Sequence, residues 1–186
     1  MPTAHASAVK KGRALLLPAL AIAMSLWLAT TQSTLAQSSG CVLVPDEQNP
    51  PQKILRCGDN LIVHEASGTT YQTVGATKRA IPRAIRLESG ALLLEFHPSV
   101  ARKDFQILTP HAIAAVRGTR WAVEVSPDKS STLVLSGAVS VRRVNVRPQV
   151  ILRDGEGVDV SPGSEPLVVK KWGAARVQAL LARFGD

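Results

Sequence analysis

The residues able to do chemistry are few in this sequence and lie far apart. His64, His97 and His111 show no metal-ligand spacing, and no Cys-x-x-Cys pair accompanies them. No serine stands in a Gly-x-Ser-x-Gly elbow, and the acidic stretch 154–159 lacks the Asp-x-Asp-x-Asp-Gly order of a calcium loop. A carboxylate pair for glycosidic hydrolysis, brought together only by folding, stays open. The sequence therefore predicts a protein that is not an enzyme and holds no cofactor or metal.

Two side chains are better candidates for binding than for catalysis. Arg117 precedes a glycine, and its guanidinium could clamp a carboxylate or phosphate through two hydrogen bonds. The alternative is that Arg117 pairs with an acid such as Glu124 or Asp104 and fixes a corner of the fold. Trp121 leads an apolar face, which favours a place in the core over a stacking platform for sugar rings.

The elements that must position these side chains alternate with period two. Apolar residues alternate in 121–125, 133–135 and 139–141, with turn residues at 126–129 and 136–137. Strict alternation bounded by turn residues predicts half-buried β-strands. An apolar–x-Gly–apolar pattern occurs at four glycines, which predicts a chain that repeatedly turns a corner. These glycines are Gly58, Gly90, Gly137 and Gly155, and their unequal spacing argues against a repeat of fixed period.

The centre of the chain resembles a known family. The string from Thr109-Pro110 through Val116-Arg117-Gly118-Thr119, followed by a strand, a turn and a strand ending in Leu135-Ser136-Gly137-Ala138-Val139, is similar to the core of the FecR domain. The resemblance is specific over about 105–160. It implies a twisted, solenoid-like all-β structure, which the sequence pattern alone does not separate from a sandwich.

The same resemblance implies a role. FecR domains are best known as the periplasmic portion of regulators that relay a signal from an outer-membrane receptor. The resemblance thus implies a protein partner, either an outer-membrane receptor or an inner-membrane signalling protein. The residues that it marks as family motif or interaction residues are Arg117, Gly118, Thr119, Trp121 and Gly137.

Residues 1–36 have the layout of a secretory signal peptide. Three basic residues precede an apolar run of sixteen residues, 14–29, and Thr34-Leu35-Ala36 offers a small-x-small cleavage site before Gln37. The run is short for a membrane span, which needs about 20 residues. The sequence therefore predicts export to the periplasm. The alternative is that the leader stays uncleaved, and we expect the chain to contact a membrane only through such a leader.

Cysteine usage and charge agree with export. Cys41 and Cys57 are the only cysteines, and an oxidising compartment would let them form a structural disulfide. Loss of the three basic residues of the leader lowers the formal net charge from +8 to +5. The remaining basic residues are dispersed, without aromatic interleaving or a recognition motif, so no nucleic-acid partner is predicted.

The predicted organisation has four parts. The leader (1–36) is followed by a flexible N-terminal segment (37–51), a FecR-like β-domain (52–165) and a C-terminal helix (166–186). Apolar residues spaced at i, i+3, i+4 and i+7 between Val177 and Phe184 predict an amphipathic helix, which we expect to pack on its own domain. The alternative is a helix that docks a partner or lies on a membrane surface.

The predicted function is an interaction or sensing module in the bacterial envelope. Only thirteen residues precede the apolar run, too few for the cytoplasmic anti-sigma segment that the family's regulators carry. An alternative of another class is a binding protein for envelope polysaccharide or a small anionic ligand, which would use Arg117 and Trp121.

Overall fold

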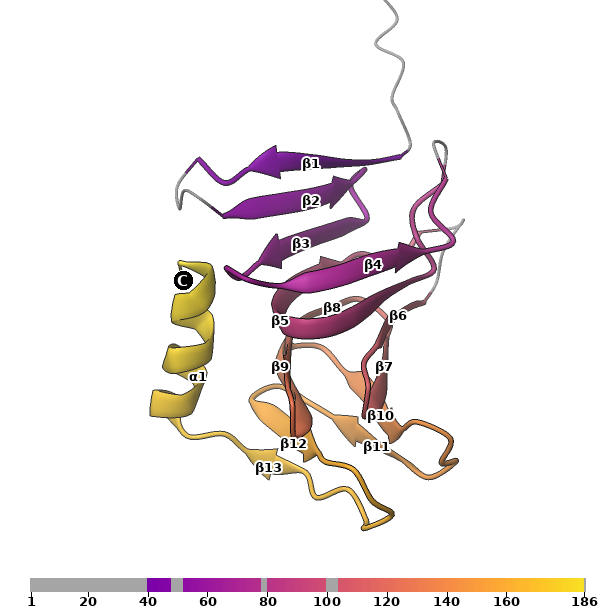
Figure 1. The fold of residues 1–186 in the computed structure, drawn as a ribbon, viewed down its shortest axis with the longest axis vertical. Coiled ribbons are helices and arrows are strands. Elements are labelled where there is room, and N and C mark those ends of the chain that lie inside the picture. Colours follow the sequence, from indigo (N-terminus) through magenta and orange to yellow (C-terminus); the bar gives the residue numbers. More distant parts are fainter. Residues whose placement is uncertain (1–39, 48–51, 78–79, 100–103, 186) are drawn as a thin grey trace, which may run out of the picture. The chain divides into compact units, whose positions relative to one another are not determined.

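The computed structural model describes residues 40–47, 52–77, 80–99 and 104–185. The predicted signal peptide and its cleavage site lie outside these residues. Residues 36–186 form a compact unit of their own. The described residues form short strands and one short C-terminal helix (Figure 1), which confirms the predicted all-β class with a terminal helix. No helix in this described part is both long enough and apolar enough to cross a membrane.

The chain folds mostly into hairpins. The strands are Cys41–Pro45 (β1), Lys53–Cys57 (β2), Leu61–Glu65 (β3), Thr70–Val74 (β4), Ala84–Phe96 (β5), Phe105–Leu108 (β6), Ala112–Val116 (β7), Thr119–Ser126 (β8), Lys129–Ser136 (β9), Val139–Arg143 (β10), Gln149–Leu152 (β11), Glu156–Val160 (β12) and Lys170–Lys171 (β13). The helix α1 (Ala174–Leu181) continues into a 3₁₀ turn, η1 (Ala182–Phe184).

Strand β5 belongs to both halves of the sheet. Its first part, 84–89, pairs with β4 and, in parallel, with β6, whereas 90–96 pairs with β3 and β8. The change occurs at Gly90, whose φ is 89°. A Cβ there would lie 2.6 Å from Thr69 Cα, so only glycine lets the two segments approach.

Two half-sheets result, joined through β5. The first half-sheet has the strand order β4-β5-β6-β7-β10-β11. The second half-sheet has the order β1-β2-β3-β5-β8-β9-β12-β13.

The solenoid that the family resemblance implied is not what forms. Consecutive antiparallel hairpins, β6–β7, β8–β9 and β10–β11, lie alternately in the first, second and first half-sheets, and the sheet curls into a half-barrel. Among the described strands, β5–β6 is the one parallel pair. The physical reason is that short turns return the chain antiparallel, whereas the parallel strands of a solenoid need longer connections.

The main core lies between the two half-sheets. Trp121, Phe96 and Phe105 are fully buried in it. The Phe96 and Phe105 rings stack with centroids 5.7 Å apart, and Phe105 meets Trp121 edge-on at 6.4 Å. Inward positions of both half-sheets supply the rest of this cluster, as the period-two alternation predicted.

A second, smaller core lies on the outer face of the second half-sheet. Leu180 and Phe184 of the C-terminal helix are buried there against Leu93, Ala122 and Leu133. The helix therefore packs on its own domain. Helical structure begins only at Ala174, since 170–171 form a strand with β12.

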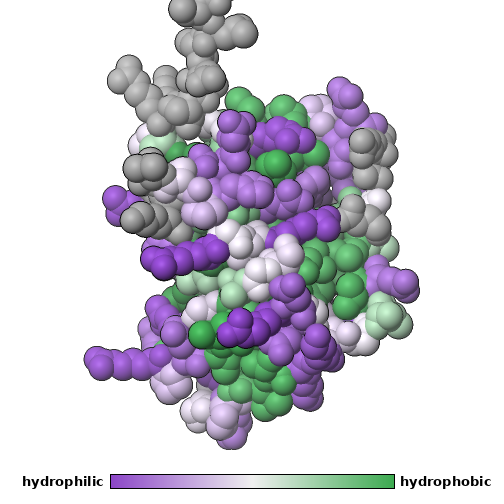
Figure 2. Space-filling view, turned by 180° about the vertical axis from the view of Figure 1, so that it is seen from behind, coloured by the Kyte–Doolittle hydropathy of each residue, from purple (hydrophilic) through white to green (hydrophobic). Residues whose placement is uncertain are grey.

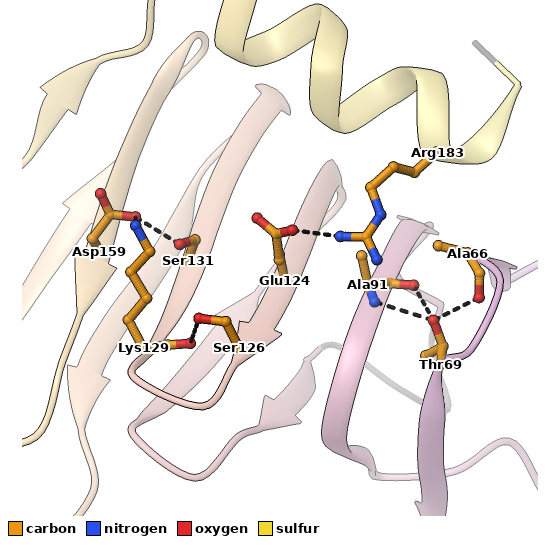
Figure 3. A network of polar contacts seen from close by, with 9 residues as sticks. All are labelled: Ala66, Thr69, Ala91, Glu124, Ser126, Lys129, Ser131, Asp159 and Arg183. Carbon is orange, nitrogen blue, oxygen red and sulfur yellow. Dashed lines mark hydrogen bonds and ion pairs between the residues drawn. The ribbon is translucent and has the colours of Figure 1, made fainter.

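Polar contacts fix the helical segment near both of its ends, and Figure 3 shows the contact of Arg183 at its C-terminal end. Arg183 reaches from η1 to the carboxylate of Glu124 on β8, and Gln52 Nε2 donates a hydrogen bond of 3.0 Å to the carbonyl oxygen of Arg183. Near the other end, Arg176 donates two hydrogen bonds to Asp159, of 3.0 and 2.5 Å. The same guanidinium lies 3.4 Å from the centre of the Trp172 ring, a cation–π contact.

Asp159 makes the helix contact sensitive to acid. Burial alone would raise the pKa of its carboxyl group, but hydrogen bonds from Arg176 and Ser131 and the positive charges of Arg176 and Lys129 outweigh burial and hold the pKa below its ordinary value of 3.8. A depressed pKa contributes stability above the unfolded-state pKa and loses it as the pH falls through the folded-state pKa.

We therefore expect the wild-type chain to lose more stability between pH 7 and acid conditions below the ordinary Asp pKa than an Asp159→Asn variant does. The difference should be less than about 1 kcal/mol, because the Asp159 side chain is 37% exposed and solvent screens it. Urea unfolding of both chains at neutral and acid pH measures it. Equal acid dependence of the two chains would contradict the assignment.

The segment 37–51, predicted to be flexible, contains an ordered strand. Residues 41–45 pair with β2, and Cys41 stands directly opposite Cys57. The predicted disulfide joins these two residues, whose Cα atoms are 4.0 Å apart, and is confirmed. The backbone N–H of Asp46 donates to the Gln52 carbonyl oxygen at 2.8 Å. Order here comes from the covalent bond and the cross-strand ladder, which local composition does not reveal.

Replacing both cysteines by serine is expected to cost about 3 kcal/mol of the free energy of unfolding, because the bond closes a loop with a sequence separation of 16. Urea unfolding of the oxidised wild type and of the Cys41→Ser/Cys57→Ser chain measures the loss. Wild type treated with a reductant serves as the control and should fall to the stability of the variant. No loss in either would show that the strand pairing suffices without the bond.

Candidate functional site

The sequence-predicted motif lies where the chain crosses between the half-sheets. Arg117 and Gly118 lead from β7 in the first half-sheet to β8 in the second. Gly137 leads back from β9 in the second half-sheet to β10 in the first. The two crossings are neighbours, because Val139 and Val116 are opposite each other in the β7–β10 pair.

Short backbone contacts lock these crossings together. Thr119 Oγ1 donates a hydrogen bond of 3.0 Å to the carbonyl oxygen of Ala138. Gly118 and Gly137 have φ values of 71° and 96°. A Cβ on Gly137 would lie 2.7 Å from the carbonyl oxygen of Gly118, so the two corners touch only because residue 137 is glycine.

A third crossing, 153–155, completes the corner. The backbone N–H of Gly137 donates to Asp154 Oδ1 at 2.8 Å, and that of Gly155 donates to the Val134 carbonyl oxygen at 2.8 Å. The sequence pointed to the Asp-Gly turn but not to the role of Asp154, which lies 17 residues from Gly137. We call the crossings 117–119, 137–138 and 153–155 the corner cluster.

Arg117 lies on the exposed surface of the corner cluster. Of the two acids that the sequence offered as partners, Glu124 pairs with Arg183 instead, and Asp104 forms no ion pair with Arg117. Among the described residues no ion pair of Arg117 occurs. Its guanidinium is thus available to solvent and to a partner.

Trp121 lies in the core and not on the surface. It is fully buried, and its indole Nε1 has no hydrogen-bond acceptor within the described part of the chain. A sugar ring cannot stack on a side chain that water does not reach. The structure therefore removes the aromatic platform that a glycan-binding alternative needed.

A shallow hollow of about 330 Å³ opens beside the corner cluster. Glu95 and Arg120 are opposite each other on β5 and β8, and Arg120 Nε lies 2.9 Å from Glu95 Oε1. Both side chains are about one third exposed, so this ion pair contributes little stability and can exchange partners. The lining residues are Glu95, His97, Gly118, Thr119, Arg120 and Ser136.

The described residues hold no metal-binding cluster. No group of three or more His, Cys, Asp or Glu side chains within 40–47, 52–77, 80–99 and 104–185 could hold a metal ion. His111 Nδ1 lies 3.1 Å from Ser130 Oγ, but Ser130 is fully buried and no substrate reaches it. Burial and the neighbouring Glu65 carboxylate raise the pKa of Tyr71 well above its usual range, so this phenol stays protonated.

Comparison with known proteins relates part of the corner cluster to a family model. Residues 52–140 match the family model described as "FecR protein". A search of the curated proteins found no match. This family supports a signalling or sensing role.

Two solved structures share the fold. A proposed anti-sigma factor from Parabacteroides distasonis ATCC 8503 is 19% identical, with a TM-score of 0.56 over 76% of this chain and 63% of that chain. A second crystal structure of a proposed anti-sigma factor from the same organism is 18% identical, with a TM-score of 0.52 over 77% of this chain and 61% of that one. The chain thus spans less than two thirds of either. At this identity the likeness concerns the fold alone.

The family match runs from β2 into β10 and contains two of the three crossings of the corner cluster, 117–119 and 137–138. Residues 52–140, slightly less than half of the 186 residues, are thus similar to FecR proteins.

Proposed function

We propose that this chain is an exported, non-enzymatic module that senses or relays a signal in the periplasm of a two-membrane bacterium by contacting a protein partner. The observation that carries the proposal is the similarity of 52–140 to FecR proteins, with its motif arginine exposed and without an ion-pair partner among the described residues. The partner is an envelope protein, either an outer-membrane receptor or an inner-membrane signalling protein.

Two features support export. Residues 1–36 have the composition and order of a cleavable leader. The chain also holds a disulfide between Cys41 and Cys57, and such bonds persist in oxidising compartments and are rare in the cytoplasm.

The surface supports contact with a protein rather than enclosure of a small molecule. The hollow beside the corner cluster is shallow, and hydrophobic side chains emerge in separate places between hydrophilic ones on the face in Figure 2. Exposed apolar side chains are found on edge strands, including Val42 and Leu43 on β1 and Ile151 on β11. Small apolar patches within a polar rim are typical of protein interaction surfaces.

Location is tested by fusing alkaline phosphatase, which is active only after export, behind residue 186. We expect activity from the fusion of the full chain and none from a fusion that lacks residues 1–36. Equal activity of the two fusions, or none in either, would refute export. Washing membranes with carbonate then separates a cleaved, released chain from one that is anchored by its leader.

Partner contact is tested by crosslinking in intact cells. We expect a crosslinked protein species that an Arg117→Glu variant loses and an Arg147→Glu variant keeps, because Arg147 is also exposed but lies in the β10–β11 turn away from the corner cluster. Absence of any such species, or equal loss in both variants, would refute the assignment of the corner cluster as a contact site.

A small anionic ligand is the alternative occupant of the hollow, because Arg120 lines it and can release Glu95. Citrate and inorganic phosphate are the probes. A rise in melting temperature that Arg120→Gln abolishes would favour this alternative, since a ligand stabilises the state that binds it.

A further inference from the structure

Strand β1 (Cys41–Pro45) is an edge strand without the usual protection. It pairs with β2 on one side, and no strand of the described ranges pairs with its other side (Figure 1). Edge strands are normally guarded by charged side chains, a bulge or an interior proline. The sequence Cys-Val-Leu-Val-Pro carries no charge, and its proline is the last residue. Val42 and Leu43 are 50% and 51% exposed, on opposite faces of the strand.

This edge is held rigidly in the extended conformation that pairing requires. The disulfide fixes Cys41 to Cys57, and the hydrogen bond from the Asp46 N–H to Gln52 fixes the other end. A strand that is already ordered loses little conformational entropy when another strand joins it.

We propose that β1 is the surface where two copies of this chain pair, antiparallel and across a twofold axis. The sequence Val42-Leu43-Val44 reads the same in both directions. Antiparallel pairing centred on Leu43 sets this residue against Leu43 of the second copy and sets Val42 against Val44, so apolar side chains meet on both faces. The second half-sheet then continues from one copy into the other.

Charge does not oppose a second copy as the occupant. No residue of β1 is charged, so pairing in this register sets no charge of one strand against a like charge of the other. Five-residue strands bury a small area, so the dimer is weak and depends on concentration.

Sedimentation equilibrium of residues 37–186, which contain the disulfide and both core clusters, tests the proposal. We expect the apparent mass to rise from the monomer value at micromolar concentration toward twice that value near millimolar concentration. Leu43→Lys should stay monomeric throughout, because it places two like charges opposite each other. Ile151→Lys is the matched control, being a charge on the exposed edge strand β11, where the wild-type side chain is 56% exposed, and it should dimerise like wild type.

The concentration dependence of amide hydrogen exchange gives a second measurement, because the stability of the monomer does not change with concentration. Amides of 41–44 should exchange more slowly as the concentration rises, whereas those of 149–152 should not change. A wild-type chain that stays monomeric at every concentration overturns the proposal, as does a dimer that persists in Leu43→Lys or is lost in both variants. These outcomes are independent of the role proposed for the corner cluster.

Discussion

Replacing Trp121 by alanine is expected to lower the free energy of unfolding by about 3–5 kcal/mol, the usual cost of truncating a buried tryptophan. The indole is fully buried, stands opposite Leu94 across the β5–β8 pair, and touches the ring of Phe105. Since single domains are stable by only about 5–15 kcal/mol, the variant should lose a large share of its stability. Urea unfolding followed by circular dichroism measures the change.

The matched control is Trp121→Phe. Because the indole N–H has no acceptor among the described residues, phenylalanine loses volume but no hydrogen bond, and we expect a cost of about 1–2 kcal/mol. A Trp121→Ala chain with wild-type stability would contradict the place of this residue in the core. If such a chain had also lost affinity for an envelope polysaccharide, the glycan alternative would return.

The local features of the fold, namely which strand positions face the core and where the chain turns, could be predicted from the sequence. Alternation placed Trp121 and its neighbours at i+2 on one face of a strand, and they do face the core. Glycine marked the places where the chain turns, because a positive φ is a local property. Gly90, Gly137 and Gly155 lie at crossings between the half-sheets, and Gly58 lies in the β2–β3 turn.

The long-range pairings could not be predicted, because nothing near a residue in sequence encodes them. Glu124 forms an ion pair with Arg183, which lies 59 positions later in the sequence, and so does not pair with Arg117. The same limit applies to the half-sheet in which each hairpin lies. Successive hairpins alternate between the half-sheets because the three crossings pack together. This long-range packing produces a half-barrel and not a solenoid.

Arg143 was not identified from the sequence as a buried charge, although the period-two alternation of its strand indicated it. Arg143 continues the inward positions of β10 and is only 9% exposed. Its guanidinium donates to the carbonyl oxygens of Ser161 and Glu165, the latter at 3.0 Å, and so ties the segment after β12 to β10. An arginine at an inward position of a strand predicts such a contact with backbone carbonyls, because a buried charge needs partners.

Replacing Gly137 by alanine is expected to cost about 2–4 kcal/mol, the sum of a left-handed backbone conformation that a Cβ disfavours and an overlap that forces the corner apart. The added Cβ would lie 2.7 Å from the Gly118 carbonyl oxygen and 3.0 Å from Thr119 Oγ1. Both atoms belong to the Arg-Gly-Thr segment, so displacing residue 137 should also displace this segment. Urea unfolding measures the cost, and the hydrogen bond from Thr119 to Ala138 should weaken with it.

Gly58→Ala separates the two contributions to this cost. Gly58 also has a positive φ, 56°, but no atom lies within 4 Å of the position that its Cβ would take. We expect Gly58→Ala to cost about 1 kcal/mol, from backbone strain alone. Equal costs at the two glycines would mean that the crossings do not press on each other. The Arg-Gly-Thr segment would then be only a local turn between β7 and β8, not held in place by the neighbouring crossing. Arg117 would then have no fixed position from which to contact a partner.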